Sequence, residues 1–358
     1  MLSLAFLLVF RLAPDLPEVK YSQPQMASLG DRVGLTFGSA DTIYYATSKN
    51  DGETFTQPVA LPTGGKMALG RHRGPRMVYH TNGLVISAIV GKKGGGADGD
   101  LMAWRSENQG ETWAKPVRIN DVPGSAREGL HAMTSGNGWI LAAWLDLRDK
   151  GTRLYMARST DGGRSWSRNF LVYESPEGTI CQCCHPSLVV AAGGAVHAMF
   201  RNSLDGSRDM YIATSRDGGS TWKIAEKLGR GTWKLNACPM DGGSLTVSAN
   251  NKIYTVWRRE KTIYVSLPDT KESELGEGKD PAVASGFNDH IYAVWVSPTG
   301  AIMTRSTEVD QAKELAPKGG YPQILFTGHR VLAAWEDENG IAVGTVPSPS
   351  LKSASDFQ

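Results

Sequence analysis

The sequence predicts an all-β fold, a β-propeller with seven blades by repeat count. The chain has 358 residues with 41 glycines and a hydrophobic fraction of 41%, which suits many short strands joined by tight turns. A Ser-x-Asp-x-Gly-x-Thr-Trp pattern recurs at regular spacing, inside a larger unit of about 40–55 residues. Repeats of this period that each hold three or four strands are typical of a propeller.

The short pattern occurs four times, as "SKNDGETF" at 48–55, "SENQGETW" at 106–113, "STDGGRSW" at 159–166 and "SRDGGSTW" at 215–222. Each copy follows a strand-like run such as "TIYYAT" or "MYIAT". The Asp or Asn side chain can accept hydrogen bonds from the backbone of its own turn, and glycine supplies the positive φ. The final aromatic side chain can cover the turn. We therefore expect four self-contained hairpin turns.

The larger unit contains an apolar run, a turn, a second run that often ends in an aromatic residue, and a third run. We count seven units, with six blades as the alternative. A proline opens six units and Leu130 opens the third: Pro24, Pro75, Pro186, Pro239, Pro281 and Pro322. Because the first strand of each blade lines the central channel, the preceding residues should ring its mouth. These residues are Gln23, Gly74, Gly129, His185, Cys238, Asp280 and Tyr321.

The ends of the chain differ from its middle. Residues 2–10 are apolar or small, so 1–15 are interpreted as a leader segment, with a buried first strand as the alternative. Residues 16–350 are assigned to one propeller, closed by a strand near 16–22, and 351–358 to a polar tail. Export to the periplasm or the cell exterior is expected, which favours disulfides. The net charge of +2 does not indicate nucleic acid, and no internal run is apolar enough to span a membrane.

The four turns resemble the Asp boxes, or BNR repeats, of the sialidase superfamily, in which they are structural. The resemblance covers nearly the whole chain as architecture, although sialidases have six blades. It implies a carboxylate-bearing sugar held by three arginines, between an acid/base aspartate and a tyrosine nucleophile that a glutamate activates.

Residue by residue, the resemblance implies Arg73, Arg201 and Arg258 as the arginines, Asp98 as the acid/base and Tyr321 as the nucleophile. The motif around Arg73 departs from the family, with His72 and Gly74 in place of Phe and Ile. The place of the activating glutamate is His185, which does not reproduce the charge of a carboxylate. As active-site chemistry the resemblance is therefore partial.

Ionisable residues also gather where the third unit opens. Arg127, Glu128 and His131 cluster there, and Asp146 ends the next strand. Such a concentration of charge at a strand start is costly unless the groups are paired or used. A substrate-binding pocket and a structural ion-pair network are the two interpretations.

The stretch "TICQCCHPSL" at 179–188 contains three of the four cysteines, and the fourth, Cys238, opens the next unit. One interpretation is two disulfides, with Cys183 or Cys184 joined to Cys238. A second is a copper or zinc site of Cys181, Cys183, Cys184, His185 and Cys238, with Met240 and His131 as further ligands. A redox or catalytic thiol is the third.

Two hypotheses about function follow. The first is a secreted sialidase-like propeller that binds or hydrolyses an anionic glycan at the channel mouth and requires no cofactor. The second is a non-catalytic exported propeller whose Cys/His cluster binds copper or zinc or supports a partner-binding face. The arrangement of Arg73, Asp98, Arg201 and Tyr321 favours the first, and the missing glutamate favours the second. Whether the protein is an enzyme stays open at this point.

Overall fold

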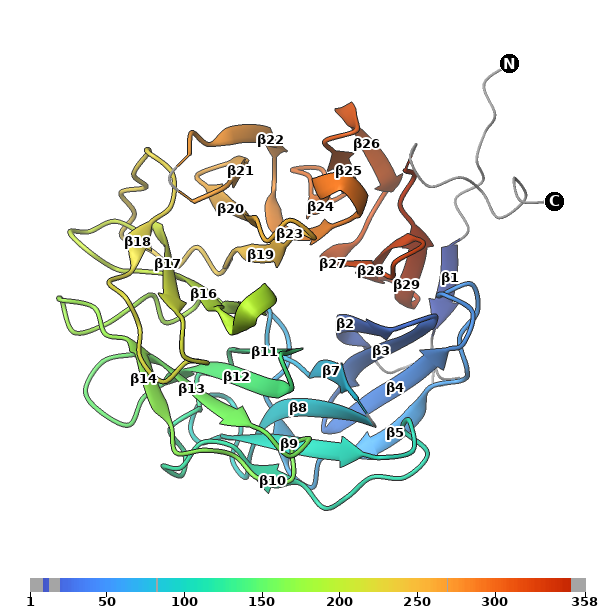
Figure 1. Ribbon diagram of the computed structural model, residues 1–358, viewed down its shortest axis with the longest axis vertical. Helices are drawn as coiled ribbons and strands as arrows, with labels where there is room; N and C mark the ends of the chain where they lie inside the picture. The colour runs from blue at the N-terminus through green and yellow to red at the C-terminus, as the bar shows by residue number, and fades with distance from the viewer. Residues whose placement is uncertain (1–8, 13–19, 82, 269, 349–358) are drawn as a thin grey trace.

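Seven antiparallel sheets stand around a central channel in the computed structural model, which describes residues 9–12, 20–81, 83–268 and 270–348 (Figure 1). Sheets that are consecutive in the chain lie side by side around the ring (Figure 1). The predicted all-β, seven-bladed propeller is therefore confirmed, and the alternative of six blades is wrong. Within the described part of the chain, no helix is long and apolar enough to serve as a membrane span.

The first four blades follow the chain in order. Their strands are β2 (Ser22–Leu29), β3 (Arg32–Ser39), β4 (Thr42–Ser48) and β5 (Val59–Pro62); β6 (Lys66–Met67), β7 (Arg76–His80), β8 (Gly83–Gly91), β9 (Asp100–Ser106) and β10 (Val117–Arg118); β11 (His131–Gly136), β12 (Trp139–Asp146), β13 (Arg153–Ser159) and β14 (Phe170–Tyr173); and β15 (Ser187–Val190), β16 (Val196–Arg201), β17 (Met210–Ser215) and β18 (Glu226–Lys227). A short 3-10 turn, η1 (Ala192–Gly194), joins β15 to β16.

The last three blades have the same plan. Their strands are β19 (Ser244–Val247), β20 (Ile253–Arg259), β21 (Thr262–Ser266) and β22 (Ser273–Glu277); β23 (Lys279–Ser285), β24 (Ile291–Val296), β25 (Ile302–Ser306) and β26 (Val309–Ala316); and β27 (Gly320–Phe326), β28 (Val331–Asp337), β29 (Gly340–Thr345) and β1 (Val9–Leu12). A 3-10 turn, η2 (Phe287–Asp289), joins β23 to β24.

The ring is closed by β1, which pairs antiparallel with β29, with Arg11 opposite Ala342 and Leu12 opposite Ile341. The outermost strand of the last blade therefore comes from the N-terminal end of the chain. The prediction that a strand near 16–22 closes the ring is wrong, because the closing strand is Val9–Leu12, within the segment interpreted as a leader. Residues 1–8 and the predicted tail at 351–358 lie outside the described residues, so the leader stays a prediction.

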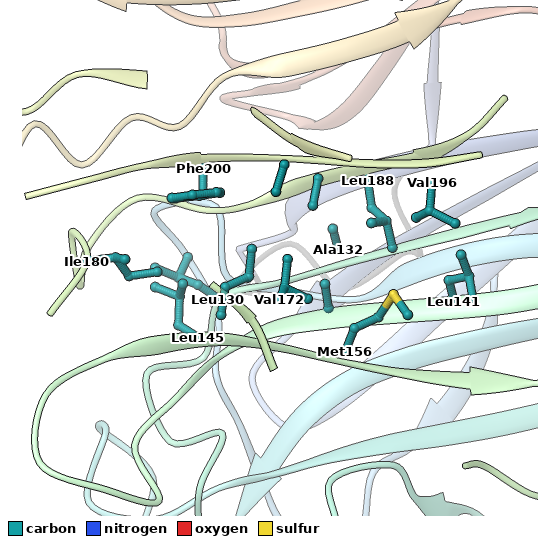
Figure 2. Close-up of a cluster of buried hydrophobic side chains, with 14 residues drawn as sticks. Leu130, Ala132, Leu141, Leu145, Met156, Val172, Ile180, Leu188, Val196 and Phe200 are labelled. Carbon is teal, nitrogen blue, oxygen red and sulfur yellow. The ribbon is translucent and has the colours of Figure 1, made fainter. Parts of the chain in front are cut away.

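The hydrophobic core lies between neighbouring blades. Figure 2 shows the contact between the third and fourth blades, where Leu130, Leu145 and Met156 meet Leu188 and Phe200. The aromatic residues expected near the ends of second strands include Trp144, Trp295 and Trp335. These three are among the largest fully buried side chains. Burial of a large aromatic side chain contributes about 2 kcal/mol or more, so these contacts hold adjacent blades together.

All four Asp-box turns connect the third strand of a blade to its fourth. In each, the first serine accepts a hydrogen bond from the glycine N–H four positions on, at 2.8–2.9 Å. The Asp or Asn Oδ1 accepts the N–H four positions after it, at 2.9–3.0 Å. These turns therefore close on themselves. Because strands alternate in direction, they lie at the end of the propeller opposite the blade openings.

Three blade openings contain a β-bulge. The pairing register shifts between Ser22 and Gln25, between Lys279 and Ala282, and between Gly320 and Gln323. Within each bulge the residue before the proline has a positive φ: 62° at Gln23, 55° at Asp280 and 49° at Tyr321. Left-handed backbone at a residue with a side chain is uncommon and is concentrated at functional sites. The bulges re-aim these side chains at the channel mouth.

Candidate functional site at the channel mouth

A cavity of about 150 Å³ lies just inside the channel mouth, and the inner strands or openings of all seven blades line it. It is smaller than the cavities of about 300–1,000 Å³ that enclose drug-sized ligands. A larger ligand must therefore lie across the mouth and insert only a small group.

His72 reaches this cavity on an excursion in the inner strand of the second blade. Met67 pairs with Val90 and Arg76 with Ser87, so the inner strand advances nine positions while β8 advances three. The excursion has positive φ at Arg71 (52°) and His72 (66°). Two consecutive left-handed residues that are not glycine require support from the surrounding structure, which is typical of a functional loop.

Four side chains from four blades meet at the mouth. The Nε2 atom of His72 lies 2.8 Å from Oδ1 of Asp280, and both side chains are 6% exposed. The ring of His185 stacks on His72 with centroids 4.1 Å apart, and the ring of Tyr321 meets His72 edge-on at 5.0 Å. Tyr321 and His185, predicted as catalytic, are therefore both at the mouth, with His72 in contact with each.

His185 is held as a neutral ring. Its Nδ1 accepts the backbone N–H of Gly242 at 3.3 Å. Burial, followed by the neighbouring His72 ring and the Arg76 guanidinium, lowers the pKa of His185 well below its usual value. His185 therefore does not supply the negative charge of the glutamate whose place it takes.

Asp241 forms a second layer behind Asp280. Its Oδ2 accepts the backbone N–H of Asp280 at 3.1 Å and lies 2.9 Å from Nε of Arg258. Its Oδ1 has no hydrogen-bond partner among the described residues. Burial, and then the charge of Asp280, raises the pKa of Asp241. His72, Asp241 and Asp280 offer ligand atoms within 4.8 Å of one another, a donor set that suits a hard or borderline cation.

The sequence reasoning missed Asp241 and gave no role to His72 or Asp280. It placed Cys238 at the opening of the fifth blade, but that residue is exposed and β19 begins only at Ser244. The sequence signal that could have indicated Asp241 is the pair of glycines after it, because they delay the start of β19. The signal for His72 is the group of arginines and glycines that surrounds it in the sequence.

Arg201 and Arg258 are used inside the protein. Arg201, 1% exposed, donates from Nε to the carbonyl of Asp241 at 3.0 Å, from Nη1 to that of Arg208 at 2.5 Å and from Nη2 to that of Arg258 at 3.0 Å. Arg258 donates to the carbonyl of Pro239 at 2.8 Å and pairs with Asp241. These contacts correct their predicted role as carboxylate ligands, because both guanidinium groups hold the backbone around Asp241.

The arginines nearer the solvent lie on the rim. Arg73 donates from Nε to the carbonyl of Glu128 at 2.6 Å, and its Nη2 lies 4.0 Å from the Glu128 carboxylate. These two side chains are about one quarter exposed, and Arg71 and Arg127 are exposed. Arg76 lies deeper and lines the cavity. The predicted cationic character of this blade opening is therefore present at the rim and in the cavity.

The other members of the third-blade cluster are structural. His131 is buried, with Nε2 2.9 Å from Oγ of Ser87, and burial lowers its pKa well below the usual value. Asp146 accepts hydrogen bonds from Ser125 and Trp144 and pairs with Arg148. The cluster therefore divides into the buried His131 and Asp146 and two residues nearer the solvent, of which Glu128 contacts Arg73 and Arg127 is exposed.

Asp98 closes its own loop. Its carboxylate accepts the backbone N–H groups of Lys92 at 2.8 Å, Lys93 at 3.0 Å and Gly94 at 3.0 Å. These hydrogen bonds, that of Lys93 first, lower the pKa of Asp98. These hydrogen bonds occupy the Asp98 carboxylate within its own loop, and its role as acid/base stays a prediction.

Three of the four cysteines converge. The Sγ atoms of Cys181, Cys183 and Cys184 are 3.5–4.0 Å apart, and all three residues are buried. Cys238 and His185 lie outside this group. A disulfide requires sulfurs about 2.05 Å apart, and the described residues contain none. The predicted disulfide to Cys238 is therefore not present.

Comparisons with known proteins agree with this architecture. Three similar solved structures cover most of the chain. A Fusarium graminearum α-L-arabinofuranosidase is 12% identical, with 85% of this chain and 99% of that one covered and a TM-score of 0.58, and a Staphylococcus aureus virginiamycin B lyase is 15% identical, with 95% and 100% covered and a TM-score of 0.59. A Hadza microbial sialidase is 15% identical, with 93% of this chain and 66% of that one covered and a TM-score of 0.56. At these identities they show a shared fold. A search of curated protein sequences gave no match. The model of the BNR repeat-like domain matches residues 70–272, more than half of the chain, and the protein therefore belongs to the BNR repeat-like domain family.

Proposed function

We propose that the protein binds the acidic terminal sugar of a glycan at the channel mouth. The observation that carries this proposal is the convergence of His72, His185, Asp280 and Tyr321 beside a rim that presents Arg71, Arg73 and Arg127. Guanidinium groups match the planar fork of a carboxylate and bind it with paired hydrogen bonds. Aromatic rings offer the flat apolar surface on which a sugar ring packs.

The size of the cavity limits how such a ligand is bound. A space of about 150 Å³ admits one substituent of a sugar but not a chain of sugars. The glycan therefore lies across the rim and directs one polar group toward His72 and Arg76. A Penicillium chrysogenum arabinanase of the same fold was solved with arabinobiose, which supports a carbohydrate as the ligand class.

Hydrolysis of the bound glycan is a second candidate function, favoured by the contact of Tyr321 with the His72–Asp280 pair. Burial, and then the charges of Asp280 and Glu336, raises the pKa of Tyr321, so its hydroxyl needs a base to become a nucleophile. A carboxylate hydrogen-bonded to a histidine orients the ring and stabilises its protonated form. His72 would take the proton of Tyr321 as the phenolic oxygen attacks the anomeric carbon and the bond to the leaving-group oxygen breaks, and that oxygen would take a proton from solvent. Water would then hydrolyse the tyrosine-linked sugar, and His72 would return the proton to Tyr321.

Binding is tested by calorimetric titration of the full chain with 3′-sialyllactose, a galacturonic acid trimer and neutral lactose. We expect the acidic sugars to bind and lactose not to bind. Arg73→Ala should weaken binding about tenfold, because one charge-assisted interaction is lost. The matched control is Arg216→Ala, an exposed arginine in the fourth Asp-box turn, at the other end of the propeller. Equal binding of lactose, or equal loss in both variants, contradicts the proposal.

Hydrolysis is tested with fluorogenic sialoside and arabinofuranoside substrates. We expect release by the wild-type protein and loss of at least about 100-fold in Tyr321→Phe and in Asp280→Asn, the scale of a lost general base. Binding of the acidic sugar should survive in Tyr321→Phe. Binding without any release by the wild type rejects hydrolysis and leaves the binding proposal intact. Export remains part of the proposal and is tested by cell fractionation.

A further inference from the structure

The group of Cys181, Cys183 and Cys184 lies in the connection between β14 and β15. The three side chains are 4%, 8% and 1% exposed, and Met240 from the connection into β19 packs against them. Met240 has a positive φ of 59°, so the backbone turns sharply there. Three thiols therefore meet at one buried place, and the half-buried Met240, whose Sδ lies 3.8 Å from Nη1 of Arg71, packs beside them.

The spacing of the thiols fits a metal ion. Their Sγ atoms are 3.6, 3.5 and 4.0 Å apart, and a point equidistant from all three lies about 2.1 Å from each. Metal–thiolate bonds are about 2.3 Å long, so an ion slightly out of the plane of the sulfurs satisfies all three without movement of the backbone. The open side of such a site is where a fourth ligand belongs.

The chemistry of the donors selects the ion. We propose that Cys181, Cys183 and Cys184, with the thioether of Met240 beside them, bind one Cu(I) ion. Soft thiolate and thioether ligands favour Cu(I). Zinc takes four ligands from cysteine, histidine and carboxylate groups, and among the described residues no histidine or carboxylate belongs to this group. Coordination of Cu(I) by three thiolates releases the three thiol protons to solvent.

The ion also has a consequence for the channel mouth. Cys184 directly precedes His185, and Met240 directly precedes Asp241. A filled site would hold together the two connections that carry these mouth residues. The metal proposal does not depend on the glycan proposal, because its readouts are metal binding and ligand distances.

The experiment uses reduced full-length protein under anaerobic conditions, titrated with Cu(I) against the chelator bathocuproine disulfonate. We expect one Cu(I) per chain and sulfur-only coordination near 2.2–2.3 Å by X-ray absorption, as thiolate ligation requires. Parallel titration with Zn(II) should give binding that copper displaces.

Variants separate the ligands from the fourth cysteine. Cys183→Ser should weaken Cu(I) binding by at least about 100-fold, since even indirect changes at metal sites cost 10–100-fold. Cys238→Ser is the matched control, because Cys238 is exposed and outside the group, and it should bind copper like the wild type. Met240→Leu keeps the shape and removes the sulfur, so it should lower affinity less and change the absorption edge. Circular dichroism of each metal-free variant checks folding.

Three outcomes overturn the proposal. The first is a disulfide between two of the three buried cysteines that persists after mild reduction and leaves no copper bound. The second is stoichiometric Zn(II) that Cu(I) does not displace. The third is a loss of copper in Cys238→Ser equal to that in a folded Cys183→Ser protein.

Discussion

The two ends of this propeller use the same residue types in opposite ways. At the Asp-box end, Asp217 accepts hydrogen bonds from Ser215 and Thr221, which lie two and four positions away. At the channel mouth, Asp280 contacts His72 across 208 positions and Asp241 across 39. The Asp-box aspartate is exposed, whereas the aspartates of the mouth are buried.

This difference shows which polar groups serve the fold and which remain for chemistry. An Asp-box side chain completes a turn whose partners are present as soon as the hairpin forms. The mouth groups gain their partners only when seven blades have closed, and one oxygen of Asp241 still has no hydrogen-bond partner within the described part of the chain. Buried side-chain atoms without a hydrogen-bond partner among the described residues also occur in the Asp-box turns, at Asp51, Gln109, Trp113 and Trp166, so what separates the two ends is the sequence distance between partners.

The largest effect is expected at Arg201, which links the mouth to the rest of the fold. Arg201→Met leaves one buried and two part-buried carbonyl groups without this donor, and an unsatisfied buried group costs about 1–3 kcal/mol. We expect the free energy of unfolding to fall by about 3–5 kcal/mol, measured by chemical denaturation. Arg216→Met at the Asp-box end should change it by less than about 0.5 kcal/mol. Similar losses in the two variants would erase the proposed contrast between the two ends.

A smaller effect is expected at the Asp-box end. Asp217→Ala removes the acceptor of the Thr221 N–H and hydroxyl and should cost about 1 kcal/mol, as loss of a cap does. Asp217→Asn should be nearly neutral, because Asn50 and Asn108 accept the equivalent N–H in the first two turns. Thermal unfolding of both variants measures the difference. A loss in Asp217→Asn as large as in Asp217→Ala would show that charge, not the turn hydrogen bonds, is what matters.

The smallest effect is a pH dependence of opposite sign at the two ends. The pKa of Asp241 is raised by burial, so its contribution to stability is full at low pH and is lost as the pH rises through that raised pKa. The hydrogen bonds of Thr221 lower the pKa of Asp217 to about 2, so its contribution is full above the usual pKa and is lost as the pH falls toward 2.

The measurement compares melting temperature against pH for Asp241→Asn, Asp217→Asn and the wild type. The difference in melting temperature between Asp241→Asn and the wild type should change as the pH rises above about 4, the usual pKa of aspartate. The difference in melting temperature between Asp217→Asn and the wild type should change as the pH falls below about 4. Curves that run parallel to the wild type at every pH would mean that neither carboxylate changes its pKa on folding.

Much of the fold could be predicted because its signals repeat. Seven units and four self-closing turns were visible in the sequence, and prolines marked five of the blade openings, whereas Pro239 precedes β19 by five positions. The closing strand could not be assigned because an apolar run such as "LAFLLVF" suits both a leader and a strand, and only the pairing of Val9–Leu12 with β29 shows that these four residues form a strand. A strand that pairs across more than 300 positions leaves no local pattern.

The site was predicted less well than the fold. His185 and Tyr321 were placed at the mouth and Arg73 at its rim, because the position before a blade-opening proline follows from the repeat. Arg201, Arg258 and Asp98 were assigned to substrate, but their donors or acceptors are taken up by backbone groups of this chain. The chemical type of a side chain is written in the sequence, whereas the partner that uses it is not.

The sequence by itself determined the β-propeller, the number of its blades and the places of its turns, because these depend on local periodicity and on hydrogen bonds within about four positions. Only the tertiary structure decided which polar groups are free. Closure of the ring brings His72, Asp280, His185 and Tyr321 from four blades to one axis and buries Arg201 among carbonyl groups. The physical reason is that burial and long-range partners, not residue type, decide whether a charge stabilises the fold or remains available to a ligand.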